Sequence, residues 1–119
     1  MPVRSLTSSV LRWPDRRCVE EALHDWLTRE AGRHPDLVRL GYFGSYARGD
    51  WGVGSDLDLI ALVREAGEPF ERRALSWDLN PLPVPAELLV YTEAEWRRLL
   101  DSGSRFAETV MREAVWVHP

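Results

Sequence analysis

The chain has 119 residues, a formal net charge of −4, and apolar and charged fractions typical of a folded protein. This length provides one hydrophobic core, so we expect a single domain over residues 1–119. The sequence has no block of basic residues, which argues against a broad electrostatic grip on nucleic acid, and no apolar run long enough to span a membrane.

The cysteine and lysine content excludes further classes of protein and of reaction mechanism. Cys18 is the single cysteine, which excludes a disulfide framework and favours a reducing, cytoplasmic location. All 15 Lys or Arg positions are occupied by arginine. The absence of lysine excludes a Walker phosphate-binding loop and a Schiff-base mechanism, since both require it.

The first predicted element with a clear period is a helix over residues 15–33. A short strand over residues 9–12 is one interpretation of the segment before it. Asp15 is a good N-cap, and Gly32 and Pro35 terminate the helical pattern. The 3.6-residue period predicts an inward face of Cys18, Val19, Ala22, Leu23, Trp26 and Leu27, with charged residues including Glu30 on the outward face.

Two strands are predicted next, separated by a glycine-rich segment. The first covers residues 37–43 and stops at Gly44. Residues 45–49 favour one helical turn, and residues 50–54 a loop. Residues 57–63 are apolar on both faces, as expected for a strand in the centre of a sheet.

The C-terminal half alternates between helix and strand. A helix is expected over residues 70–79 and a strand over residues 82–91, where Pro83 and Pro85 restrict the early part to an edge or a bulge. Thr92 and Glu95 form a capping-box pattern.

That capping box predicts a helix over residues 93–100. A further helix begins after Ser104 and ends at 111 or 112, and a short strand over residues 115–117 closes the chain. The expected inward residues of the last helix are Phe106, Ala107, Val110 and Met111. The order of elements indicates an α/β (α+β) fold, a small mixed sheet of three to five strands covered by helices.

Two acids open the central strand. Asp56 and Asp58 are two residues apart, and the period of a strand places both carboxylates on one face. Like charges this close repel each other, and a divalent cation removes that cost. Oxygen ligands of this kind suit Mg²⁺ or Mn²⁺. The other interpretation is a pair of solvated acids at a strand end.

Gly44 and Ser45 end the preceding strand. If the two strands are antiparallel neighbours, these residues share one rim of the sheet with Asp56 and Asp58. Glycine allows close approach of a phosphate to the backbone, and a serine hydroxyl can bind it. In isolation the Gly-Ser pair would be an ordinary turn.

The combined pattern is more specific than its parts. Its spacing, with Gly49 between the Gly-Ser pair and the acids, resembles the signature of the DNA polymerase β-like nucleotidyltransferase superfamily. Its local form is similar to that of the minimal nucleotidyltransferases (MNT), the antitoxin-type partners of HEPN-domain proteins. The residues that carry this resemblance read GSYARGDWGVGSDLDL.

The resemblance implies a role for each matching residue. Gly44 and Ser45 would bind the nucleotide phosphates, and Asp56 and Asp58 would hold the metal ions. The family takes a third acid from a later strand, and only Glu87 is available here. The family usually has Asp at that place, so a metal role for Glu87 is a looser match. Glu87 could instead be a charged residue that protects an edge strand from aggregation.

Three further residues lie within the signature. We assign Arg48 and Ser55 to nucleotide binding together with the Gly-Ser pair. The Arg48 guanidinium could clamp a phosphate, or it could pair with Asp50 or cap the turn. Trp51 could stack on a base, although packing is the favoured interpretation.

The resemblance also implies a function. The chain would use Mg²⁺ or Mn²⁺ to move AMP from ATP onto a hydroxyl of a partner, a HEPN-type toxin. Because the sequence offers no second substrate-binding domain, such a partner or self-association would have to complete the site. The alternative is a catalytically weak or inactive nucleotide-binding antitoxin that covers its partner, and transfer to a small hydroxylated molecule is disfavoured.

Overall fold

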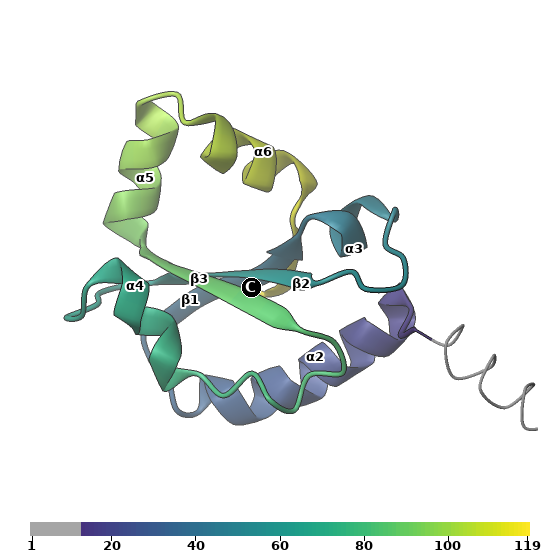
Figure 1. Cartoon of the computed structure of the whole chain (residues 1–119). Coiled ribbons are helices and arrows are strands. Elements are labelled where there is room, and N and C mark those ends of the chain that lie inside the picture. The colour runs from purple at the N-terminus through teal and green to yellow at the C-terminus, as the bar shows by residue number, and fades with distance from the viewer. Residues whose placement is uncertain (1–12) are drawn as a thin grey trace, which may run out of the picture.

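The computed structural model describes residues 13–119, so the strand considered over residues 9–12 lies outside it. These residues form one four-stranded sheet between two layers of helices (Figure 1). The strand order is β3-β2-β1-β4. The strands are β1 (Leu37–Phe43), β2 (Leu57–Val63), β3 (Ala86–Thr92) and β4 (Val115–His118).

Both directions of strand pairing occur in this sheet. β1 is antiparallel to β2 and to β4, whereas β2 is parallel to β3. β1 and β2 have the predicted bounds, and the expected antiparallel pairing of these strands is confirmed. The mixed sheet with helical cover confirms the predicted fold class.

Helix α2 (Arg16–Ala31) covers one face of the sheet. Its N-cap is Asp15, whose carboxylate accepts a hydrogen bond from the Cys18 backbone N–H at 2.9 Å. Cys18 was predicted to face the core, but it is exposed. Glu30 was predicted to face solvent, but it is buried. The reason is the rotation of the helix, whose buried stripe runs through Val19, Leu23, Trp26, Leu27 and Glu30.

The helix predicted over residues 70–79 is shorter in the structure. It consists of α4 (Phe70–Arg73) followed by a 3₁₀ turn, η1 (Ala74–Ser76). The backbone becomes extended at Trp77, with φ −106° and ψ 136°. This turn buries the Trp77 ring against that of Trp26, with the ring centroids 5.8 Å apart, so core packing ends the helix early.

Strand β3 also begins later than the predicted residue 82. Pro83 and Pro85 lack the N–H group that a paired strand uses, which explains the start at Ala86. The Pro85 carbonyl still accepts a hydrogen bond from the Leu57 backbone N–H at 2.8 Å.

The other face of the sheet is covered by α5 (Glu93–Asp101) and α6 (Arg105–Glu113) (Figure 1). The predicted capping box of Thr92 and Glu95 is present. Phe106 and Met111 were predicted to be inward, but they are 37% and 40% exposed. The buried residues of α6 are Ala107 and Val110, which form a narrower stripe than the sequence pattern indicated.

A buried arginine joins α4 to α5 beside the free edge of β3. Arg73 donates to both carboxylate oxygens of Glu95, at 2.6 and 3.0 Å, and to the Val90 carbonyl at 3.1 Å. The hydrogen bonds from Arg73 are the main reason that the pKa of Glu95 falls to about 2. This contact covers part of an edge strand that would otherwise be open to pairing.

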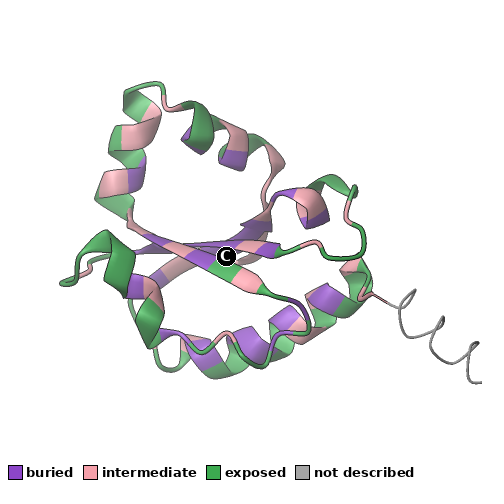
Figure 2. Cartoon of the chain, viewed as in Figure 1, coloured by how far each residue is buried: buried purple, intermediate pink, exposed green. Residues whose placement is uncertain are grey.

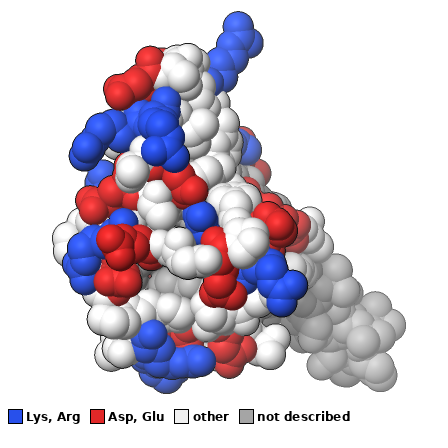
Figure 3. All heavy atoms as spheres, turned by 90° about the vertical axis from the view of Figure 1, so that its left-hand side faces the viewer, with Lys and Arg blue, Asp and Glu red and all other residues white. Residues whose placement is uncertain are grey.

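Burial is concentrated at the sheet and on the inner sides of the helices (Figure 2). One core lies between the sheet and α2, and a smaller one between the sheet and the α5–α6 layer. Within residues 13–119, no helix is long and apolar enough to cross a membrane. Basic and acidic side chains are interspersed on the face shown in Figure 3.

Candidate active site at one rim of the sheet

Strand register brings the two halves of the sequence pattern together. Phe43, the last residue of β1, pairs with Asp58 of β2, and Asp58 pairs with Glu87 of β3. Gly44 follows Phe43 and begins α3 (Ser45–Arg48), the predicted helical turn. The end of β1 therefore lies beside the start of β2, as the sequence predicted.

Gly44 is in close contact with the Asp58 side chain. Its φ of +77° and ψ of −153° are open to glycine but strained for other residues. A Cβ atom at this position would lie 2.2 Å from Oδ2 of Asp58. The backbone conformation and the adjacent carboxylate therefore both require glycine here.

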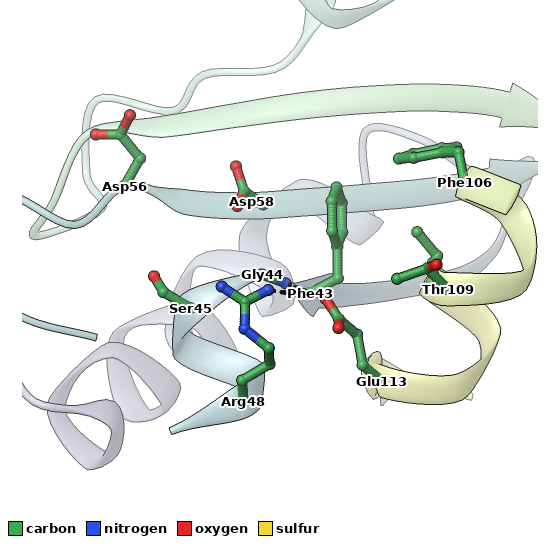
Figure 4. A pocket seen from close by; sticks show the side chains of 10 residues that line it. Phe43, Gly44, Ser45, Arg48, Asp56, Asp58, Phe106, Thr109 and Glu113 are labelled. Atoms are coloured by element: carbon green, nitrogen blue, oxygen red, sulfur yellow. Dashed lines mark hydrogen bonds and ion pairs between the residues drawn. The ribbon is translucent and has the colours of Figure 1, made fainter. Parts of the chain in front are cut away.

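A cavity of about 460 Å³ opens at this rim (Figure 4). One part of its lining is polar and comes from the loop, α3 and the start of β2. The other part is more apolar and comes from the end of β1 and from α6. The lining residues are Phe43, Gly44, Ser45, Arg48, Asp56, Asp58, Phe106, Thr109, Val110 and Glu113.

The Asp58 carboxylate is in an unfavourable electrostatic environment. Burial raises its pKa, and the negative charges of Glu87 and Asp56 raise it further, while Arg48 opposes them. A divalent cation would relieve both effects, and carboxylate oxygens are the ligands that Mg²⁺ and Mn²⁺ prefer. Within residues 13–119, however, no three His, Cys, Asp or Glu side chains gather closely enough to form a metal-binding group.

Glu87 lies at the edge of this arrangement. Its position in the register places it beside Asp58 and on the same face of the sheet. Its side chain is exposed, and Glu87 is outside the set of residues that line the cavity. The structure therefore brings Asp56 and Asp58 into the pocket and leaves Glu87 next to it.

Arg48 has acidic partners on two sides. Its Nε donates to Oδ2 of Asp50 at 3.1 Å, and this pairing is one of the interactions considered from the sequence. Its Nη1 donates to Oε1 of Glu113 at 3.4 Å. The exposed guanidinium still lines the cavity (Figure 4).

Local contacts stabilise the loop over residues 50–55, which connects α3 to the paired acids. The Ser55 hydroxyl accepts a hydrogen bond from the Gly52 backbone N–H at 2.8 Å, so this predicted nucleotide-binding residue lies in a turn and is not among the lining residues. Trp51 stacks on Tyr46, with ring centroids 5.8 Å apart and an interplanar angle of 8°. This packing agrees with the favoured interpretation of Trp51.

Sequence reasoning missed Glu113, the last residue of α6. Its Oε1 accepts a hydrogen bond from the Gly44 backbone N–H at 2.9 Å, and thus contacts two cavity-lining residues, Gly44 and Arg48. One signal was available, because an acid in the last turn of a helix is unfavourable beside the negative end of the helix dipole. An acidic residue at such a position often has a specific interaction partner.

These features define an α/β domain with a glycine, a serine and paired acids at one rim of a mixed sheet. The family model described as nucleotidyltransferase domain matches residues 21–117, and the chain belongs to this family. The superfamily resemblance seen in the sequence is therefore confirmed.

Two solved structures have a similar fold. One is a candidate nucleotidyltransferase from Sulfolobus solfataricus, with a TM-score of 0.61 and 20% identity over 85% of this chain and 80% of that one. The other is a toxin–antitoxin with AMP-PNP, with a TM-score of 0.50 and 17% identity over 82% of this chain and 70% of that one. No curated protein matches this sequence significantly.

Proposed function

We propose that the chain is a metal-dependent nucleotidyltransferase that moves a nucleoside monophosphate, AMP from ATP, onto a hydroxyl of a partner protein. In this proposal it acts as the MNT antitoxin of a HEPN-type toxin. Membership of the nucleotidyltransferase family supports the reaction class. The toxin–antitoxin neighbour supports a protein partner and a bound nucleotide.

The observation that carries the proposal is the contact between Gly44 and Asp58. It places a backbone without a side chain directly against a carboxylate, at the mouth of a cavity that Ser45 and Asp56 also line. A triphosphate with its metal needs both a phosphate-binding backbone and metal-binding acids within a few ångströms. An ordinary turn does not require its backbone to lie this close to a carboxylate.

Asp56 and Asp58 would hold the metal, with Glu87 as the additional acid. A bound Mg²⁺ or Mn²⁺ would neutralise charge on the triphosphate and on the leaving pyrophosphate. Gly44, Ser45 and Arg48 would position the phosphates. Ser55 would keep the loop before Asp56 in shape through its contact with the Gly52 N–H.

The transfer itself is an in-line substitution at the α-phosphorus. The acceptor oxygen bonds to phosphorus, and the bond from phosphorus to the oxygen that bridges to the β-phosphate breaks, so pyrophosphate leaves. The hydroxyl proton would pass to a carboxylate, and we assign this role to Glu87, which pairs with Asp58 in the strand register. A tyrosine of the partner fits the acceptor role, and self-association of this chain is the other way to complete the site.

A second candidate function is a catalytically inactive antitoxin that binds nucleotide and neutralises its partner by steric cover. The observation that favours it is the position of Glu87 outside the cavity lining. A site with two carboxylates can bind a metal–nucleotide complex and still lack the acid that completes transfer.

Co-expression with the protein encoded next to this chain, followed by intact mass measurement of that protein, tests the proposal. The expected result is a mass increment of one nucleoside monophosphate, absent when the chain carries Asp56→Asn and Asp58→Asn. An unmodified partner in a tight complex would support the inactive antitoxin instead. Absence of both modification and complex would contradict the toxin–antitoxin role.

Glu113 leads to a separate prediction about nucleotide affinity. Its carboxylate occupies the Gly44 N–H and pairs with Arg48, the same donors that a phosphate would use. Glu113→Ala should therefore strengthen binding of inorganic triphosphate by roughly tenfold, which corresponds to about 1.4 kcal/mol. Isothermal titration calorimetry measures this directly.

Glu108→Ala provides the matched control. It removes the same charge from an exposed position on the same helix. If both variants change the affinity equally, the effect comes from net charge and not from competition at Gly44. Weaker binding in Glu113→Ala would mean that Glu113 helps to shape the phosphate site.

A further inference from the structure

The cavity at the rim has two chemically different ends. The polar end carries Gly44, Ser45 and the two acids, and the proposed function places the triphosphate there. The other end carries aromatic side chains, Phe43 and Phe106, with the Thr109 hydroxyl beside them (Figure 4). A nucleoside triphosphate has the same division between a charged end and an aromatic end.

Phe106 is held in place by its aromatic neighbours. Its ring packs edge-to-face against Phe43, at 5.8 Å and 81°, and against Trp96, at 6.1 Å and 85°. It nevertheless remains 37% exposed and lines the cavity. A rigid aromatic ring that is partly exposed inside a pocket is suited to stacking against a flat ligand.

We propose that Phe106 binds the aromatic base of the donor nucleotide by stacking, with Thr109 one turn later on the same wall. This inference rests on the proposed function, because it assumes a triphosphate at the Gly44 end. The cavity volume of about 460 Å³ is within the usual range for a small-molecule site. The first turns of α6 thus provide the nucleoside half of the site, and the sheet rim with α3 provides the phosphate half.

Two ligands separate this role from a purely structural one. The first is an ATP analogue that cannot be cleaved between the α- and β-phosphates, and the second is inorganic triphosphate, which has no base. Stacking on a base is worth roughly 1–3 kcal/mol, so Phe106→Ala should weaken binding of the analogue by about 5- to 150-fold. Binding of inorganic triphosphate should stay within about twofold of the parent chain.

Phe70→Ala is the matched control. Phe70 is also 37% exposed and also packs against Tyr91, but it lies in α4, outside the cavity lining. It should leave the affinity for both ligands unchanged. Phe106→Leu keeps most of the apolar volume and loses the ring face. It should therefore show a selective loss of affinity for the analogue, and it serves as the test variant if Phe106→Ala folds poorly.

The outcomes distinguish this inference from the function on which it rests. Unchanged affinity of Phe106→Leu for the analogue, or an equal loss for both ligands, overturns the role of Phe106 while the nucleotide site stands. If the parent chain binds neither ligand in the presence of Mg²⁺ or Mn²⁺, the proposed function fails and this inference fails with it.

Discussion

Gly44→Ala is expected to reduce nucleotide transfer by about 100-fold while the chain still folds. The new methyl group would lie 2.2 Å from Oδ2 of Asp58. That atom is the end of a side chain, so the Asp58 carboxylate would swing away from its position. A displacement of about 1 Å in a catalytic group costs roughly 100-fold in rate.

The substitution should also reduce stability by about 1–3 kcal/mol, because the backbone at Gly44 has an unusual conformation. Gly49→Ala is the control, since Gly49 also has a positive φ, of +87°, but apart from its chain neighbours no heavy atom lies within 4 Å of the added Cβ. It should lose stability and retain transfer. Similar transfer by the two variants would show that the contact between Gly44 and Asp58 has no role in the chemistry.

Asp58→Asn is expected to reduce transfer on the order of 10³-fold and to raise thermal stability. The two effects have one cause. Burial and the nearby charges of Glu87 and Asp56 raise the pKa of Asp58, so its ionised form is held at a cost in the folded chain. Asparagine removes that cost together with the charge that would bind metal.

The sign of the pH dependence follows from linkage. An acid whose pKa is raised by folding binds its proton more tightly in the native state, so its cost to stability is present above that pKa and disappears as the pH falls. The stability advantage of Asp58→Asn should therefore be largest near neutral pH and shrink in acid. Thermal melts in EDTA measure it without interference from bound metal.

Asp25→Asn is the control for this experiment, because it removes one charge from an exposed position on α2. It should change neither transfer nor the pH dependence. Addition of Mg²⁺ and the ATP analogue should raise the melting temperature of the parent and of Asp25→Asn but not that of Asp58→Asn. A melting temperature of Asp58→Asn below that of the parent chain in EDTA would contradict the unfavourable electrostatic environment of the Asp58 carboxylate.

The central part of the fold could be predicted from sequence because its signals are local. β1 ends directly before Gly44, and β2 is apolar except for Asp58. Their adjacency then places Gly44 beside Asp58, which is why these residues of the candidate site could be assigned before the structure. The capping box at Thr92 was equally local and fixed the start of α5.

The remaining parts depend on packing between distant segments, which sequence periodicity does not encode. Trp77 leaves the helical path to fill the space beside α2, and this shortened the predicted helix. Phe106 has the spacing of a core residue, but the position of α6 leaves it on the wall of the cavity. The contact between Glu113 and Gly44 joins residues 69 positions apart, so only the folded chain reveals it.

The unequal size of the two cores has a consequence for access to the pocket. In the part of the chain described, the α2 side buries seventeen clustered residues and the α5–α6 side only five. Segments with fewer buried apolar contacts open locally at lower free energy. The wall formed by α6 is therefore expected to open at lower free energy than β2, the strand that carries Asp58.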